Sequence, residues 1–393
     1  MSRPLRVAFV APQILPWLAP EAGPAAGGAE RQQLLLAREL ASRGAEVSFV
    51  AFDSDGALER PDTAAGFRVH RACSLGAGVP FLRFFHPRLT SLWRALREAD
   101  ADVYYQRCAG MLTGVVGTFC RRHGRGFVFA SAHETDCDPA ALPIRNPRDR
   151  ALYFHGLRLA HAVVAQTEEQ RALFRERLSI DAAIVRNAAV ARPLPAAPPG
   201  GRRHVLFLAA LRPWKRPEWF VELARRAPGT PFVMAGGDEP RRAGYARALR
   251  EAAARVPNLT VLGAVPPGRA LDLQAAALAF VSASEREGFP NTTLEAWSAG
   301  TPVFAAADPD SCIAASGGGV VAPDLETLSR ELLAALGDGT RLAAMGDRGR
   351  AHVLAHHDPS LAAGSLLDVL EDAARRGAGA RRPAPSRAEG ALR

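Results

Sequence analysis

Short apolar runs alternate with longer amphipathic stretches along most of the chain. The runs predict strands buried in a parallel sheet, and the stretches predict helices that cover it. In the first half the expected strands are 5–10, 46–51, 67–71, 102–105, 126–130 and 162–165, and the expected helices are 29–43, 86–99, 109–123, 147–160 and 167–178. This α/β alternation predicts a doubly wound parallel sheet with helices on both faces.

The alternation stops at residues 192–201, a stretch rich in Pro and Gly, and then starts again. The second set has strands at 204–209, 231–235, 259–262, 278–282 and 301–305, with helices at 216–227, 240–255, 267–277 and 292–299. We therefore expect two Rossmann-like domains, 1–191 and 202–355, joined by the linker 192–201. Residues 356–373 are expected to form a C-terminal helix that crosses back to the first domain, and 374–393 a disordered basic tail.

The net charge of +9 is unevenly distributed. Residues 1–200 hold 25 basic and 19 acidic residues, and residues 201–373 hold 18 and 20. A basic first half favours an anionic partner, such as a phosphorylated substrate or a lipid surface. Nucleic acid would also fit the charge, but no nucleic-acid recognition motif occurs, so that partner is not expected.

Cysteines and apolar runs indicate the compartment. The five cysteines are scattered, with no C-x-x-C pair, which fits neither a disulfide framework nor a zinc site and favours a reducing, cytoplasmic location. No run reaches eighteen apolar residues, so no transmembrane helix is expected.

The densest group of polar residues lies between 284 and 296. A strand is expected to end just before it and a helix to begin near Thr292, which aims the unpaired amides of 291–293 and a positive helix end at one spot, an anion site. Glu287 and Glu295 flank that spot and can accept hydrogen bonds from sugar hydroxyls. The local pattern leaves an alternative open, in which Thr292 and Glu295 form a capping box and Glu287 is a solvated loop residue.

The segment from Glu287 to Glu295 resembles the donor-binding signature of retaining family-4 glycosyltransferases with the GT-B fold (glycosyl transferases group 1). The resemblance implies that Glu287 contacts the donor sugar and that Glu295 holds the ribose hydroxyls. It also implies that backbone amides hold the distal phosphate of the donor. These amides belong to the loop made of Phe289, Pro290, Asn291 and Thr292. The expected enzyme moves a sugar from a nucleoside-diphosphate donor to an acceptor hydroxyl with retention, in a cleft between two domains.

Lys215 is the one lysine of the chain and follows the expected strand 204–209. It resembles the donor-phosphate lysine of this family, a compact charge that stabilises the departing nucleoside diphosphate. The family usually carries an Arg five residues earlier, where Ala210 stands here. Arg212 is a candidate for the second charge, and a surface loop cation is the alternative.

Two further candidates come from the first half. Gly27 and Gly28 resemble the family's Gly-Gly loop, in which glycine lets the backbone approach the substrate closely. His133 follows the expected strand 126–130, where family members often place a His near the transferred sugar; a packed or surface histidine is the alternative. No acidic cluster resembles a divalent-metal site, so no metal and no cofactor beyond the nucleotide-sugar are expected. The acceptor is left open as a glycan, a lipid or a small molecule.

Residues 79–97 interleave aromatic side chains with arginines: Phe81, Phe84, Phe85 and Trp93 with Arg83, Arg88, Arg94 and Arg97. One interpretation is an amphipathic helix whose aromatics face its own core. The other is a contact with the acceptor or with a membrane surface, which would place the protein at the inner face of the membrane.

Two other functions compete with sugar transfer. A non-catalytic GT-B protein would bind a sugar nucleotide or scaffold a partner, which the intact Glu287, Lys215 and Glu295 disfavour. A nicotinamide oxidoreductase would need G-x-G-x-x-G after the first strand. The glycines from Gly23 to Gly28 have a different spacing, and no acidic partner for a ribose is evident.

Overall fold

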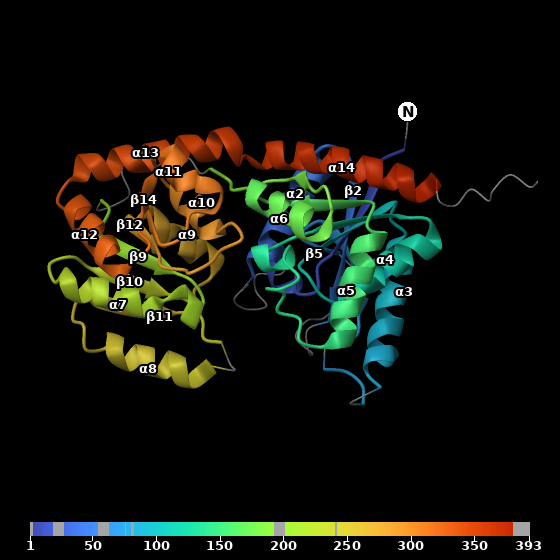
Figure 1. The fold of residues 1–393 in the computed structure, drawn as a ribbon, viewed down its shortest axis with the longest axis horizontal. Helices are drawn as coiled ribbons and strands as arrows, with labels where there is room; N and C mark the ends of the chain where they lie inside the picture. Colours follow the sequence, from blue (N-terminus) through green and yellow to red (C-terminus); the bar gives the residue numbers. More distant parts are fainter. Residues whose placement is uncertain are drawn as a thin grey trace, which may run out of the picture.

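The computed structural model describes residues 3–18, 27–53, 63–74, 76–79, 82–191, 201–239 and 242–379. The predicted linker therefore lies outside the described residues except for Gly201, and so does the tail from residue 380. Two α/β lobes lie side by side (Figure 1), each with a sheet between layers of helices. The expected fold class is confirmed.

The first lobe contains an eight-stranded sheet in the order β3-β4-β2-β1-β5-β6-β7-β8. Its strands are β1 (Arg6–Val10), β2 (Glu46–Phe52), β3 (Thr63–Ala64), β4 (Phe67–Ala72), β5 (Val103–Arg107), β6 (Gly126–Ala130), β7 (Ala162–Ala165) and β8 (Ala183–Ile184). All neighbours pair in parallel except β3 and β4. The chain runs outward from β1 to β4 and then crosses to β5 on the other side of β1. Strand order therefore reverses between β1 and β5, where open α/β sheets bind ligands.

Helices cover both faces of this sheet. They are α1 (Leu15–Leu18), α2 (Gly28–Ser42), α3 (Thr90–Ala99), α4 (Met111–His123), α5 (Pro147–Leu159) and α6 (Glu168–Leu178), with short turns η2 (Phe84–Leu89) and η3 (Glu134–Asp136). Alternate residues of β1 enter different cores: Val7 and Phe9 join one hydrophobic cluster, and Ala8 and Val10 join the other. A strand buried on both faces has this alternation, which explains the unbroken apolar run in the sequence.

The second lobe contains a six-stranded sheet in the order β11-β10-β9-β12-β13-β14, with every pair parallel. Its strands are β9 (His204–Leu208), β10 (Phe232–Ala235), β11 (Leu259–Gly263), β12 (Ala277–Ser282), β13 (Val303–Ala305) and β14 (Gly319–Val321). Its helices are α7 (Pro217–Arg226), α8 (Ala243–Ala253), α9 (Pro267–Ala275), α10 (Asn291–Ser298), α11 (Cys312–Ser316) and α12 (Leu325–Leu336), with turns η4 (Pro213–Lys215) and η6 (Pro309–Ser311). This strand order is that of dinucleotide-binding Rossmann domains.

Two long helices end the described chain. α13 (Gly339–His356) belongs to the second lobe, and α14 (Pro359–Gly379) packs against β6 and α2 of the first, as Figure 1 shows along its upper edge. The predicted bounds 356–373 are wrong at both ends, and residues 374–379, expected to be disordered, are helical. The cause is close packing: a methyl group on Gly377 would lie 2.3 Å from the carbonyl carbon of Arg125. The absence of a side chain lets the last turns of α14 lie directly on the first lobe.

Other differences from the sequence-based expectation are local. The predicted helix 86–99 begins as the irregular turn η2, in which His86 has non-helical dihedral angles, and only then continues as α3. Pro87, which has no backbone N–H, cannot extend the helix at that point. The short strands β3, β8 and β14 were missed, because two or three residues carry no periodic pattern and are defined by their pairing partner.

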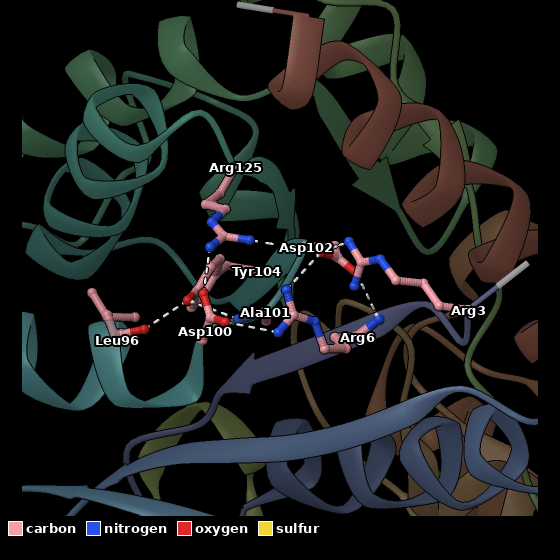
Figure 2. A network of polar contacts seen from close by, with 8 residues as sticks. All are labelled: Arg3, Arg6, Leu96, Asp100, Ala101, Asp102, Tyr104 and Arg125. Carbon is pink, nitrogen blue, oxygen red and sulfur yellow. Dashed lines mark hydrogen bonds and ion pairs between the residues drawn. The ribbon is translucent and has the colours of Figure 1, made fainter. Parts of the chain in front are cut away.

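A network of charged residues joins the amino ends of the central strands β1 and β5 (Figure 2). It lies at the end of the sheet opposite the carboxyl ends of the strands. Arg6 donates hydrogen bonds to Asp100 at 2.7 Å and to Asp102 at 3.1 Å, and Arg3 donates to Asp102 at 2.8 Å. Arg125 pairs with both carboxylates. The hydrogen bond from Arg6 holds the pKa of Asp100 below its usual value. This network fixes the start of the two central strands.

Candidate functional site

A cavity of about 710 Å³ is lined by both lobes, at the carboxyl ends of their strands. All residues that the sequence proposed for the site line it: Gly27, Gly28 and His133 from the first lobe, and Arg212, Lys215, Glu287, Phe289, Pro290, Asn291, Thr292 and Glu295 from the second. The structure thus brings every candidate into one place. Their roles stay predictions.

Lys215 and Glu287 form an ion pair in the cavity wall. Lys215 ends the turn η4 after β9, and Glu287 lies in the loop after β12. A backbone hydrogen bond of 2.9 Å from Glu285 to Trp214 ties these two loops together. The ammonium is therefore held at the carboxyl end of the sheet, where a ligand of such a fold is expected.

The loop before α10 differs from its expected form in one respect. Thr293 donates its backbone N–H to the carbonyl of Pro290 at 3.1 Å, so the prediction that amides 291–293 are all unpaired is wrong for Thr293. The first turn of the helix tightens onto Pro290 and satisfies that donor. The predicted anion site narrows to the amides of Asn291 and Thr292.

Glu295 does not form the capping box that the local pattern left open. The helix has no side-chain cap, and Glu295, 6% exposed, pairs across the cleft with Arg31 of α2. Burial raises the pKa of Glu295, and Arg31 partly offsets that effect. Sequence reasoning gave Arg31 no role, because nothing local shows that α2 faces α10.

Asn291 joins the two lobes. Its side-chain amide donates to the carbonyl of Gly28 at 2.9 Å, and its oxygen accepts from Gln32 and Asn187 at 3.0 Å each. A methyl group on Gly28 would lie 2.6 Å from the Asn291 amide nitrogen. A larger residue at the start of α2 would therefore displace the Asn291 side chain from these hydrogen bonds.

His133 faces the loop of Glu287. Its Nδ1 accepts a hydrogen bond of 3.2 Å from the backbone N–H of Thr135, which places the proton of the neutral ring on Nε2. A methyl group on Gly288 would lie 2.4 Å from the carbonyl oxygen of Ala132. The Glu287 loop therefore packs directly on the backbone that carries His133.

Arg212 lines the cavity but is turned toward other partners. Its Nε lies 3.8 Å from the Glu239 carboxylate, and its guanidinium lies 5.2 Å from the centre of the Trp214 ring. Ala210, which also lines the cavity, brings no charge.

The aromatic stretch 79–97 divides between core and surface. Trp93 packs edge-on against Phe119 at 5.1 Å inside the lobe, whereas Leu82 and Phe85 are 65% and 61% exposed. Phe81 lies outside the described residues. The membrane contact stays a prediction. None of the helices among the described residues has the length and apolar character of a membrane span.

The described residues also contain no group of three His, Cys, Asp or Glu side chains that could hold a metal ion.

Two family models match the two lobes. Residues 26–189 match Glycosyltransferase Family 4, and residues 202–338 match Glycosyl transferases group 1. The chain belongs to the family-4, group 1 glycosyltransferases. No curated protein gives a significant match to this glycosyltransferase.

Solved structures similar to this glycosyltransferase have the GT-B fold. Sucrose-phosphate synthase from Thermosynechococcus elongatus is 18% identical with a TM-score of 0.76, over 94% of this chain and 98% of the other. Anabaena HepE in complex with UDP and glucose is 16% identical with a TM-score of 0.71, over 93% and 99%. WaaG, a glycosyltransferase of lipopolysaccharide biosynthesis, is 17% identical with a TM-score of 0.66, over 93% and 99%. At these identities the likeness establishes the fold.

Proposed function

We propose that this glycosyltransferase takes its sugar from a nucleoside-diphosphate donor and transfers it to an acceptor hydroxyl with retention of the anomeric configuration. The observation that carries the proposal is the Lys215–Glu287 pair in the cavity wall beside the start of α10. A diphosphate there meets an ammonium, the amides of Asn291 and Thr292, and the positive end of a helix, all of which stabilise the charge on the departing group. The HepE complex with UDP and glucose supports this class of donor.

Glu287 and Glu295 would each exchange the present partner for substrate. Glu287 would accept from hydroxyls of the transferred sugar while Lys215 turns to the diphosphate, and Glu295 would accept from the ribose while Arg31 is released. The Nε2–H of His133 is available as a donor to the sugar. The acceptor oxygen forms a bond to the anomeric carbon while the bond between that carbon and the diphosphate oxygen breaks. The proton of the acceptor hydroxyl passes to the departing phosphate oxygen. The proposal assigns charge compensation to protein groups and includes no metal.

Donor binding tests the proposal. UDP-, GDP- and ADP-sugars are screened by thermal unfolding, and we expect at least one to raise the melting temperature. Lys215→Ala and Glu295→Ala should each abolish that shift, because each removes a group that contacts the donor. Arg225→Ala, an exposed α7 arginine paired with Glu222, is the control and should keep it.

Catalysis and stereochemistry are read separately. Release of the nucleoside diphosphate from the stabilising donor distinguishes an enzyme from a protein that only binds sugar nucleotides. Proton NMR of the product should show the anomeric configuration of the donor; an inverted product contradicts retention. Unchanged donor binding in both Lys215→Ala and Glu295→Ala contradicts the assignment of the site.

A further inference from the structure

One cation of the cavity has no acidic partner. Lys215, Arg31 and Arg212 each lie within ion-pair distance of a carboxylate, whereas no carboxylate among the described residues pairs with Arg107. Arg107 is 7% exposed and lines the cavity. Its guanidinium donates a hydrogen bond of 2.8 Å to the side-chain oxygen of Asn187, which is neutral. Its Nε is buried and has no hydrogen-bond partner. A buried charge of this kind is costly unless something compensates it.

The position of Arg107 in the sheet favours a ligand. It is the last residue of β5, at the point between β1 and β5 where strand order reverses. Open α/β sheets bind ligands in the crevice outside the strand carboxyl ends at such a point. Gly27 and Gly28, at the start of α2 in the same lobe, line the same cavity. This side of the cavity faces the proposed donor residues of the second lobe and so lies where an acceptor would bind.

The backbone around Arg107 is fixed by buried hydrogen bonds. Cys108 has a φ of 76°, which is unfavourable for a residue other than glycine by about 1 kcal/mol or more. The side-chain amide of Gln106 donates to the carbonyls of Arg107 at 2.8 Å and of Cys108 at 2.6 Å, and Thr113 donates to its oxygen at 2.9 Å. A strained turn held by a buried network is typical of functional sites, where it fixes the direction of a side chain.

One carboxylate approaches without neutralising Arg107. Glu30 of α2 interacts electrostatically with Arg107 but forms no ion pair with it among the described residues. Burial raises the pKa of Glu30, and Arg107 opposes that rise only in part. Because no carboxylate among the described residues forms an ion pair with it, the guanidinium keeps donors for a ligand on this side of the cavity.

We propose that Arg107 binds an anionic group, a phosphate or a carboxylate, carried by the acceptor. The planar guanidinium presents paired donors that match either group. The basic balance of residues 1–200 supports an anionic acceptor. Through Asn187, whose side chain also donates to Asn291 at 3.0 Å, an occupied Arg107 is connected to the donor loop. This inference rests on the proposed function, because it assumes that the opposite wall binds the donor.

Ligand binding provides the first test. The full chain is saturated with whichever nucleoside diphosphate stabilises it, so that the donor site is filled, and inorganic phosphate or acetate is titrated by calorimetry. We expect one of the two anions to bind and Arg107→Gln to weaken it about tenfold or more. Arg68→Gln, which changes an exposed arginine of β4, should bind as the wild type does. The phosphate and acetate arms distinguish the two groups.

Transfer provides the second test. Acceptors are compared in pairs that differ by one anionic group: sugar phosphates with the free sugars, and uronic acids with the hexoses. We expect a higher kcat/KM for the anionic member, and Arg107→Gln should reduce that preference about tenfold. Arg107→Lys, which keeps the charge and loses the planar donors, should keep part of it. A residue that only stabilised the fold would lower both members of a pair alike.

Several results would overturn the proposal. They are no binding of phosphate or acetate by the wild type, equal binding by Arg107→Gln, or an unchanged preference between paired acceptors. If Arg107→Gln does not fold, Arg107→Lys serves in its place. The proposal would then be contradicted if Arg107→Lys binds both anions as the wild type does and keeps the same preference between paired acceptors. Failure of the wild type to bind any nucleoside diphosphate would refute the proposed function instead. In that case the anion titration on the free protein still tests Arg107.

Discussion

His357 makes the stability of this protein sensitive to mild acid. It follows α13 at the junction of the lobes, 2% exposed, with Nδ1 2.7 Å from the carbonyl of Asn187 and its ring centre 5.1 Å from that of Phe289. Burial lowers the pKa of His357 from 6.5 to about 4, and the charges of His352, Arg186 and His356 act in the same direction. The hydrogen bond to Asn187 opposes this effect but is weaker. The folded protein therefore holds this ring neutral.

The size of the effect follows from linkage. Above pH 6.5 the ring is neutral in both states and costs nothing. Between pH 6.5 and about 4 the unfolded chain binds a proton that the folded protein does not, so the free energy of unfolding falls as the pH falls. A pKa lowered from 6.5 to about 4 corresponds to a loss of about 3 kcal/mol, complete near pH 4.

The comparison with His357→Gln isolates this contribution, because all other groups titrate in both proteins. Urea unfolding followed by tryptophan fluorescence, at pH values from 7.5 to about 4, gives the difference in stability. We expect the variant to be less stable at pH 7.5, since it loses ring packing, and the gap to close by about 3 kcal/mol toward pH 4. His155→Gln, which changes a partly exposed histidine of α5, is the control for the loss of an imidazole elsewhere in the protein.

A direct titration decides the same question without unfolding. In carbon-edited proton NMR the His357 ring signals should keep their neutral shifts down to about pH 5, below the usual imidazole pKa of about 6.5. Parallel stability curves for wild type and His357→Gln, or a His357 ring that titrates near 6.5, would refute the reasoning.

Two further substitutions test packing and helix termination. Gly288→Ala places a methyl group 2.4 Å from the carbonyl oxygen of Ala132, so it should push the lobes apart there and lower the free energy of unfolding by about 1–3 kcal/mol. The melting temperature and the rate of donor turnover should both fall. Gly229→Ala, whose methyl group would lie in open space, should change neither. The partly buried Arg202 guanidinium donates to several carbonyls at the ends of α9 and α10. Arg202→Ala should therefore lower the free energy of unfolding in urea by about 3 kcal/mol, and Arg203→Ala, which removes an exposed neighbour, should hardly change it. Equal stability of the two arginine variants would contradict that assignment.

Local pattern was sufficient for most of the architecture. Strand β6 and strand β7 were predicted with the bounds that the structure has, because their residues are continuously apolar and end in clear breaks. The donor-side candidates were equally accessible, since Lys215 and Glu287 lie between a strand and the next helix, and Glu295 lies in the helix that follows, all at the end of the sheet that the alternation already indicates. A sequence contains this information because strands, turns and caps depend on neighbours a few positions away.

The groups that face those residues come from segments far away in the sequence. Arg31 and Arg107 lie far along the chain from the second lobe. The Gly27–Gly28 candidate lies close to Arg31 in the sequence, but nothing local indicates that Arg31 faces Glu295 or that Arg107 lines the cavity. For the same reason the pairing of Glu295 with Arg31 in place of a capping box depends on contact between the lobes, and the extension of α14 to Gly379 depends on its packing against β6 and α2 of the first lobe. Local patterns and the family resemblance were therefore enough for the elements, for the donor-side residues and for Gly27, Gly28 and His133 on the opposite wall. The arginines of that wall are set by contacts between distant segments, which have no periodic signature along the chain.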